Sequence, residues 1–546
     1  MDQPFLLRLI LAAAWTPQAL QQLLAWTFWL QVKEYRRDRF SLLFRSREGL
    51  LNLGFPAIAF KLLILLLAVL IPSTGLSLLA VSLLTALDIQ FLINVFTRRF
   101  RRPDLTLRSI LILLVGLVVM SGGFILTLVM PPTVAPAAIL FPAELVLLLA
   151  PALGGGLTLP LALVLKGREI VRARQHLEKH KPVVIGITGS YGKTTTKDFV
   201  AQLLSVKYET AKTSGSENVD LGIARKTLRL IQSSTKYFVV EMGAYTLGEI
   251  KAIVEIVHPR TAMVTGIEPQ HLALFGNLER IIRAKSEIVD GLPPGGTALF
   301  NFSNSYCRQM ADTARRERPD LRVLGYAVID DQTDISADLS ARVLSATTDG
   351  VRFEVVDGAQ TVQISAPVHG RHFVENLAGA ILIARLNDLT WDEIQRGCDA
   401  LQLPDKTMQV SELDNKLTLV DDSHNSTPKA FISALDYLTL FPDKKKIVIT
   451  PGIIELGPET EAVHRQLGQH LREMNVDRVI LTTKDFFVPL QSGLAEHANA
   501  ALRYSEGPAA LREILSQLGP FEHLVVLLEG RVPAYVLKIL KESRIT

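Results

Sequence analysis

The sequence predicts an α-helical membrane region followed by two α/β domains, and three observations carry this prediction. The long apolar stretches lie before residue 167, and they raise the mean hydropathy of the whole chain to +0.27. From residue 182 onward, short β-branched runs alternate with helix-like segments, which is typical of parallel sheets in α/β proteins. A glycine-rich turn between the first such run and the next helix has the form of a P-loop.

Four stretches in the first part of the chain are apolar enough to cross a bilayer, and they cover residues 55–71, 76–96, 107–130 and 135–166. The first three are close to the ~20 residues that a helical span needs. The fourth is longer and contains prolines and three consecutive glycines, so we expect one kinked span or a span followed by an interfacial segment. Glutamines interrupt residues 5–31, which also carry tryptophans, and this favours an interfacial helix or hairpin over a fifth span.

Arginines indicate the orientation of these spans. Segments 36–47, 98–102 and 168–174 are rich in arginine, whereas the turns at 72–75 and 131–136 contain no basic residue. By the positive-inside rule, the arginine-rich segments lie in the cytoplasm. We therefore predict a multi-pass protein of the cell membrane, with the lipid bilayer around residues 1–181 and the catalytic domains on the cytoplasmic side.

Net charge and cysteine content argue against a nucleic-acid-binding protein and against a fold held together by disulfides or a cysteine zinc site. A net charge of +4 is too small to indicate a nucleic-acid-binding surface, so we expect no nucleic acid partner. Cys307 and Cys398 are the only cysteines, which allows neither a disulfide framework nor a cysteine zinc site.

Residues 182–200, PVVIGITGSYGKTTTKDFV, contain the phosphate-binding signal. Gly189 and Gly192 allow backbone conformations in which consecutive N–H groups point at a polyphosphate. Lys193 would bridge the outer phosphates and Thr194 would offer its hydroxyl to Mg²⁺. Gly186 lies one residue further upstream than the common P-loop spacing requires, and the alternative is a chance glycine turn before Lys-Thr. We predict a P-loop ATPase domain.

A carboxylate follows the next strong strand signal. Residues 237–240 are β-branched or aromatic, and Glu241 comes directly after them. The carboxyl end of a parallel strand faces the ligand crevice of an open α/β sheet, so Glu241 could hold Mg²⁺ opposite Thr194. The alternative is an ordinary acid at a strand end.

Further motifs follow in order, namely HLALFGNLERIIRAKSEI, GTALFNFSN, GRHFVENLAGAI, DDSHNSTPKA and PGIIELG. Together with TGSYGKTTTK and VVEMGAYTLGEI, they resemble the Mur ligase family over residues 182–546, most closely the members that add D-alanyl-D-alanine. The resemblance implies an ATP-binding central domain at 182–404 and a Rossmann-like C-terminal domain at 405–546. It also implies an ATP-dependent, ADP-forming ligase in which ATP phosphorylates a carboxylate and an amine attacks the acyl phosphate.

The resemblance assigns residues to this reaction. It implies that Lys193, His271 and Lys285 are catalytic. Two Mg²⁺ ions would be held by Thr194, Glu241, His271 and Lys285, with Lys285 carried as a carbamate. The implied nucleotide contacts are Gly189, Ser190, Gly192, Lys193, Thr194, Thr195, Asn301, His372, Asn376, Asp422 and Asn425. Taken alone, Lys285 has a simpler alternative, a solvated lysine on the amphipathic helix 278–288.

The chain also departs from the family pattern. Lys406 stands where a hinge arginine is usual, and Glu529 stands where a lysine is usual, which bears on the amino-acid pocket. The membrane region replaces the UDP-sugar domain. We therefore predict a peptidoglycan-like or lipid-linked cell-envelope precursor as acceptor and an amino acid or peptide as donor. Two alternatives remain, a soluble cell-wall nucleotide as acceptor, and a membrane scaffold that binds ATP without ligase activity.

Overall fold

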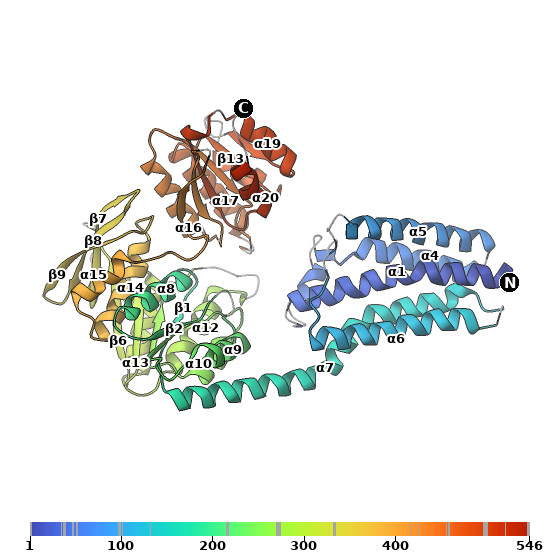
Figure 1. The fold of residues 1–546 in the computed structure, drawn as a ribbon, viewed down its shortest axis with the longest axis horizontal. Coiled ribbons are helices and arrows are strands. Elements are labelled where there is room, and N and C mark those ends of the chain that lie inside the picture. Colours follow the sequence, from blue (N-terminus) through green and yellow to red (C-terminus); the bar gives the residue numbers. More distant parts are fainter. Residues whose placement is uncertain are drawn as a thin grey trace. The chain divides into compact units, whose positions relative to one another are not determined.

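The structure is a computed structural model in which the chain divides into two compact units, residues 1–168 and 169–546. Figure 1 shows the first unit as helices in blue and cyan, and the second as an α/β assembly from green to red. The structure describes residues 3–33, 35, 40–45, 49–50, 53–71, 73–96, 100, 102–131, 133–214, 218–268, 275–330, 335–414, 416–424, 426–454, 456, 459–494, 501–518 and 520–542.

The first unit is a bundle of helices. In its described part, three helical segments are long and apolar enough to cross a membrane, Gly75–Phe96, Leu107–Val129 and Pro136–His180. The predicted span at 55–71 forms a helix of only 16 residues, which falls short of the ~20 that a span needs. Four spans were predicted, and the structure has three helices that are long enough to cross a membrane and one apolar helix that is shorter. The elements are α1 (Gln3–Val32), η1 (Leu42–Arg45), α4 (Phe55–Leu70), α5 (Thr74–Phe96), α6 (Leu107–Val129) and α7 (Pro136–His180).

Of the two forms expected for residues 5–31, the hairpin is wrong, whereas the choice between an interfacial helix and a fifth span stays a prediction. Residues 3–32 form the single helix α1, which packs against α5 and α6 and buries Trp15 and Leu23. A Cβ atom on Gly116 of α6 would lie 2.4 Å from Leu23, so the missing side chain allows the two helices to approach closely. Two of the glutamines that interrupt this apolar run have polar partners, since Gln18 Nε2 donates to Asp88 Oδ1 at 2.8 Å and Gln22 Oε1 accepts from Lys61 Nζ at 3.1 Å.

A buried ion pair connects three helices of this bundle. Lys61 Nζ on α4 lies 2.7 Å from Glu144 Oε1 on α7, and both side chains are almost fully buried. Trp15 Nε1 on α1 donates to Glu144 Oε2 at 2.8 Å, and Lys61 Nζ donates to Gln22 Oε1 at 3.1 Å. An unpaired charge would be very costly here, so these contacts fix how α1, α4 and α7 pack together.

The fourth apolar stretch forms one continuous helix. Helix α7 has 45 residues and runs through Pro142, Pro151 and Pro160. The boundary between the two compact units falls inside α7, at residue 168.

After the end of α7, the second unit contains a nine-stranded sheet, and we call residues 183–401 the central lobe. Its strand order is β2-β3-β1-β4-β5-β6-β7-β8-β9. Neighbours from β2 to β7 pair in parallel, whereas β7–β8 and β8–β9 are antiparallel, so the sheet is mixed and not wholly parallel as predicted. The strands are β1 (Val183–Thr188), β2 (Thr210–Lys212), β3 (Tyr237–Glu241), β4 (Thr261–Val264), β5 (Thr297–Asn301), β6 (Arg322–Val328), β7 (Leu339–Thr347), β8 (Gly350–Asp357) and β9 (Gln360–Ala366).

Helices cover this sheet, and both of its faces are apolar. Alternate residues of β1 belong to two different hydrophobic clusters, Ile185 and Ile187 to one and Val184 to the other. A strand with apolar side chains on both faces suits the middle of a sheet, where β1 lies between β3 and β4. The helices are α8 (Lys193–Ser205), α9 (Asp220–Leu230), α10 (Glu249–Val257), α12 (Leu278–Asp290), α13 (Ser305–Glu317), α14 (Phe373–Leu386) and α15 (Trp391–Asp399).

A six-stranded sheet forms the C-terminal lobe (residues 409–542), in the order β10-β11-β15-β12-β13-β14. All its pairs are parallel except β10–β11. The strands are β10 (Gln409–Glu412), β11 (Thr418–Asp422), β12 (Lys445–Thr450), β13 (Arg478–Leu481), β14 (Ala501–Tyr504) and β15 (Leu524–Glu529). The helices are α16 (Pro428–Tyr437), η2 (Leu438–Leu440), α17 (Thr460–Glu473), α18 (Phe487–Leu494), α19 (Pro508–Ser516), η4 (Phe521–His523) and α20 (Ala534–Glu542).

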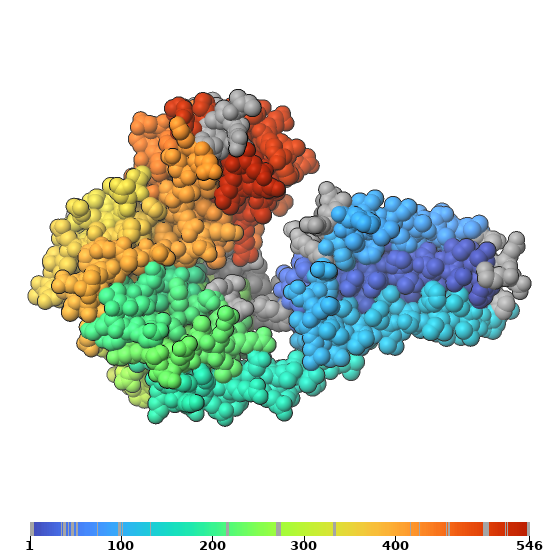
Figure 2. All heavy atoms as spheres, in the orientation of Figure 1, coloured from blue at the N-terminus to red at the C-terminus, as the bar shows by residue number. Residues whose placement is uncertain are grey.

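The two lobes share an apolar core. One hydrophobic cluster contains Phe373 and Leu377 of α14 in the central lobe together with Phe431 and Leu435 of α16 in the C-terminal lobe. In the space-filling view, the atoms of the two lobes meet directly (Figure 2). Burial of these side chains therefore holds α16 against the central lobe.

Candidate active site

The predicted phosphate-binding loop joins β1 to α8, as the sequence indicated. Gly189 has φ +153°, and a Cβ atom there would lie 2.2 Å from Thr265 Oγ1. Gly192 has φ +74°, and a Cβ atom there would lie 2.6 Å from Asn376 Oδ1. Both glycines are therefore required by backbone angle and by space. Gly192 is also the N-cap of α8 and has no side chain to accept from the first N–H groups, which leaves them for an anion.

Lys193 folds back over this loop. Its Nζ atom donates to the carbonyl oxygens of Gly189 at 2.8 Å and Ser190 at 3.1 Å. Burial lowers the pKa of Lys193, and the nearby carboxylate of Glu241 opposes that shift. The ammonium group thus lies where it could move onto a bound phosphate by leaving two carbonyl partners.

Glu241 lies beside the start of α8, as predicted. Glu241 Oε2 accepts from Thr194 Oγ1 at 2.9 Å and from Lys197 Nζ at 3.4 Å, and Oε1 accepts from Asn218 Nδ2 at 3.2 Å. Burial disfavours the charge on Glu241, but Lys197, Lys193 and these hydrogen bonds outweigh it and lower the pKa of the carboxyl. The group is therefore a carboxylate at neutral pH, next to a hydroxyl oxygen. Hydroxyl and carboxylate oxygens are the donors that Mg²⁺ prefers, so this pair fits that ion.

Lys285 and Lys193 line the same cavity, which has a volume of about 50 Å³. Lys285 on α12 is only 4% exposed, so the alternative of a solvated surface lysine is wrong. Burial, with repulsion from Lys193, lowers the pKa of Lys285 to about 7. A large share of this amine is therefore uncharged at neutral pH. The other residues that line the cavity are Gly189, Ser190, Asn218, Gly243, Ala244, Tyr245, Phe275 and Ile281.

The remaining predicted contacts of the central lobe support the loop. Ser190 N donates to Gly266 O at 2.7 Å, and Asn376 Oδ1 accepts from Thr196 Oγ1 at 3.1 Å. Buried Asn301 donates through Nδ2 to Thr265 O at 2.8 Å, which ties the end of β5 to the segment after β4. Thr195 is buried in the first turn of α8.

His372 is the N-cap of α14, the helix that also carries Asn376. Its ring packs against Phe373, with the ring centroids 4.1 Å apart. Burial and the charge of Lys429 lower the pKa of His372 to about 4, so its imidazole is neutral at physiological pH. A neutral ring suits contact with an uncharged group better than with a phosphate.

Asp422 belongs to a buried acid pair in the C-terminal lobe. It lies opposite Glu529 at the carboxyl ends of the paired strands β11 and β15. Asp422 Oδ1 accepts from Met408 N at 3.2 Å, and Glu529 Oε1 accepts from Ser426 Oγ at 2.5 Å. Burial raises the pKa of Asp422 to about 7, and burial with repulsion from Asp422 raises the pKa of Glu529 well above its usual range. The two carboxyls therefore hold at least one proton between them at neutral pH.

Two predicted site residues, His271 and Asn425, lie outside the described residues. Within the described ranges, no group of three or more His, Cys, Asp and Glu side chains is arranged to hold a metal ion. Of the predicted metal set, Thr194 and Glu241 are in contact, while Lys285 lines the cavity with Lys193. The nucleotide contact predicted for Asp422 remains a prediction.

Sequence reasoning missed several residues of this site. Lys197 follows Lys193 by four residues on α8, and that spacing could have identified it as a partner of the same carboxylate. Asn218, Glu375 and Lys429 had no comparable signal, because tertiary packing alone brings them to the loop.

Comparison with known protein families matches most of the second unit. Residues 187–384 match the Mur ligase middle domain, and residues 408–530 match the domain described as Mur ligase, glutamate ligase domain. The UDP-N-acetylmuramoyl-tripeptide–D-alanyl-D-alanine ligase of Escherichia coli is 30% identical over 316 residues, which cover 58% of this chain and 68% of that protein. The enzyme of the same name from Synechocystis is 26% identical over 344 residues, covering 63% and 70%.

Solved structures show the same fold. A crystal structure of MurF from Acinetobacter baumannii matches with a TM-score of 0.61 at 23% identity, covering 69% of this chain and 81% of that chain. The MurF ligase from Thermotoga maritima in complex with ADP matches with a TM-score of 0.58 at 22% identity, covering 69% and 83%. The family match covers the two α/β lobes and begins after the apolar helical region.

The acid pair predicts a pH-dependent stability. Because the folded state raises both pKa values, it binds protons more tightly than the unfolded chain, so the stability from the pair is greatest below about pH 4 and is lost as the pH rises through 7. Glu529→Gln keeps a donor toward Asp422 at every pH. We expect its unfolding temperature to exceed that of the unsubstituted protein by about 1–2 °C at pH 8, for ~1 kcal/mol, and to equal it near pH 4.

Thermal unfolding of the full chain in detergent from pH 4 to 8 checks this expectation. Glu522→Gln is the matched control, because Glu522 is half exposed and lies outside the pair. Identical pH profiles for Glu529→Gln and the unsubstituted protein would show that the two carboxyls do not hold a proton between them.

Proposed function

The chain belongs to the Mur ligase family of ATP-dependent ligases, and from this premise we propose that it forms an amide bond on a cell-envelope precursor at the cytoplasmic face of a membrane. The relatives that it matches are named as ligases that join D-alanyl-D-alanine to a UDP-N-acetylmuramoyl-tripeptide. The acceptor is then a peptidoglycan-like or lipid-linked precursor with a free carboxylate, and the donor is an amino acid or a short peptide.

The observation that carries the proposal is the cavity shared by Lys193 and Lys285 beside Thr194 and Glu241. A carboxylate and ATP repel each other, so their reaction needs positive charge at the transferring phosphate. Lys193, the loop N–H groups and the start of α8 supply it. Mg²⁺, held by Thr194 and Glu241, would offset the remaining phosphate charge when bound.

We propose a reaction in two displacements. A carboxylate oxygen of the acceptor attacks the γ-phosphorus of ATP, the bond to the β,γ-bridging oxygen breaks, and ADP leaves. The donor amine then attacks the carbonyl carbon of the acyl phosphate, the bond from that carbon to the phosphate oxygen breaks, and inorganic phosphate leaves. The amine loses a proton as the amide forms.

Lys285 fits a role in this site as a carbamate. An uncharged amine attacks CO₂ and loses a proton, which gives an anion, and burial beside Lys193 keeps Lys285 uncharged for a large share of the time. Such an anion could pair with Lys193 or with a bound cation, whereas a lysine ammonium would be repelled by both. His271 is proposed to complete the metal site.

For the first unit we propose a multi-pass membrane region at residues 1–181, in which α4 and α1 join the three long apolar helices inside the bilayer. Residues 182–404 would be the ATP-binding domain and residues 405–546 a Rossmann-like domain. The membrane region at residues 1–181 stands in place of the family's UDP-sugar domain, and this supports an acceptor that is delivered at the membrane.

The alternative is a membrane scaffold that binds ATP without ligating. A scaffold has no need for a second buried amine in the phosphate cavity, because desolvating Lys285 beside Lys193 costs free energy without adding to nucleotide binding. The cavity therefore favours the ligase.

Lys193→Ala tests the ligase directly. Loss of one positive group at the transferring phosphate is expected to lower acceptor-dependent ADP release by at least ~10²-fold, with the fold intact by circular dichroism. Lys251→Ala, which changes an exposed lysine of the same lobe, should behave as the unsubstituted enzyme. Near-normal, acceptor-stimulated ADP release by Lys193→Ala would contradict the mechanism.

Cysteine labelling tests the topology. Cysteines at Ser73 and Thr133 should react with an impermeant maleimide added outside intact cells, and one at Ser41 should not, because Ser41 lies in an arginine-rich segment. The native Cys307 and Cys398 are buried and give little background. Labelling at Ser41 from outside would overturn the orientation.

A further inference from the structure

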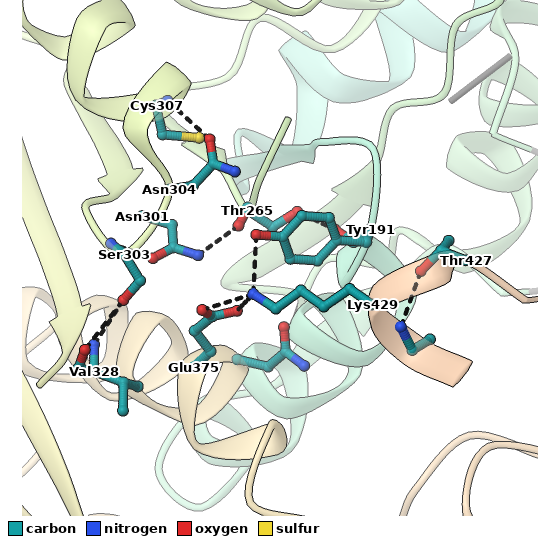
Figure 3. A network of polar contacts seen from close by, with 12 residues as sticks. Tyr191, Thr265, Asn301, Ser303, Asn304, Cys307, Val328, Glu375, Thr427 and Lys429 are labelled. Carbon is teal, nitrogen blue, oxygen red and sulfur yellow. Dashed lines mark hydrogen bonds and ion pairs between the residues drawn. The ribbon is translucent and has the colours of Figure 1, made fainter. Parts of the chain in front are cut away.

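One side chain of the C-terminal lobe contacts the phosphate-binding loop of the central lobe. Lys429 lies in the first turn of α16, two residues after the N-cap Thr427. Its Nζ atom donates to both carboxylate oxygens of Glu375, at 3.0 and 2.9 Å, and to the hydroxyl of Tyr191 at 3.3 Å (Figure 3). Glu375 belongs to the first turn of α14, and Tyr191 lies between Ser190 and Gly192 in the loop.

Tyr191 is held on several sides. A Cβ atom on Gly266 would lie 2.2 Å from the Tyr191 ring, so the ring packs directly on that backbone. The carbonyl oxygen of Tyr191 accepts from Thr265 Oγ1, and Lys429 Nζ lies 4.7 Å from the ring centroid. Because the ring has so little room, a displacement of Lys429 would change the constraint on the phosphate-binding loop.

The charge of Lys429 matters because acids surround it. Burial raises the pKa of Glu268 to about 7, Lys429 opposes that rise, and Glu375 adds to it. Ser190 Oγ donates to the carbonyl oxygen of Glu268, so this residue also contacts the loop. Without the lysine, Glu375 and Glu268 would repel each other and a bound polyphosphate.

Helix α16 contacts the central lobe at both ends. At its last residue, the hydroxyl of Tyr437 lies 3.3 Å from Nδ1 of His369, in the segment before α14. Phe431 and Leu435 belong to the apolar cluster that the two lobes share. The polar contact at Lys429 is thus part of a continuous interface, and its loss would weaken a defined docked position of the C-terminal lobe.

We propose that Lys429 is a positioning residue of the nucleotide site, which couples docking of the C-terminal lobe to the conformation of the phosphate-binding loop through Tyr191 and Glu375. This inference rests on the proposed function only in taking ATP as the ligand of the loop. By linkage, a contact that raises nucleotide affinity is itself strengthened by the nucleotide by the same factor. Docking of the C-terminal lobe and ATP binding are then mutually favourable.

The test compares Lys429→Met with the unsubstituted full chain in detergent. Binding of a fluorescent, non-hydrolysable ATP analogue should weaken by ~5-fold or more, the lower end of typical coupling between sites. Lys444→Met is the matched control, because Lys444 bonds Thr418 inside the C-terminal lobe, and its Kd should stay unchanged. The charge-swapped double variant Lys429→Glu/Glu375→Lys should bind within ~2-fold of the unsubstituted protein, which a merely structural role would not predict.

A second measurement, made without nucleotide, reports the distance between the two lobes. Spin labels at the exposed positions Thr361 and Ser516, one in each lobe, should give a broader distance distribution in Lys429→Met than in the Lys444→Met control. A weakened Kd together with a broader distribution supports the coupling. An unchanged Kd in Lys429→Met overturns it, even where the enzyme ligates normally. Absence of ligation by the unsubstituted protein contradicts the proposed function alone, because neither binding nor distance depends on it.

Discussion

Two buried lysines in one cavity set the central constraint of this protein. Lys193 and Lys285 both line a space of about 50 Å³, and burial lowers the pKa of each amine. Two neighbouring ammonium groups in a low-dielectric site repel each other, so the arrangement is favourable only with anions between them or on one of them. Glu241 supplies one anion, and the polyphosphate and a carbamate on Lys285 are the others in our account.

The fold is organised to bring these groups together. The loop follows β1, whose neighbours β3 and β4 deliver Glu241 on one side and Thr265 on the other, all at the carboxyl ends of parallel strands. The C-terminal lobe reaches the same loop through Lys429 of α16, so a helix of the other lobe contacts the proposed nucleotide site. Distance along the chain therefore says little about which residues act together here, since Tyr191 and Lys429 are 238 residues apart.

The sequence predicted what depends on local pattern. A β-branched strand, two glycines and Lys-Thr define the loop within a dozen residues, and Glu241 follows from its place at the end of a strand. The sequence did not predict contacts that depend on packing between distant parts of the chain. The packing of α1 in the bundle could not be predicted from its glutamines, because their partners, such as Asp88, lie on other helices. The pairing of Asp422 with Glu529 depends on the register of β11 and β15, which the sequence does not reveal. The contact of Lys429 with the loop depends on how the two lobes pack.

Acetate rescue of Lys285→Ala tests the account most directly. Removing the amine leaves the cavity without the anion that a carbamate provides, so ATP-dependent ligation should nearly vanish, and short carboxylates such as acetate should partly restore it. Lys285→Arg should stay inactive, because guanidinium keeps its positive charge. Lys285→Arg with the activity of the unsubstituted enzyme, or Lys285→Ala with full activity in the absence of acetate, would contradict the role of Lys285 in the site.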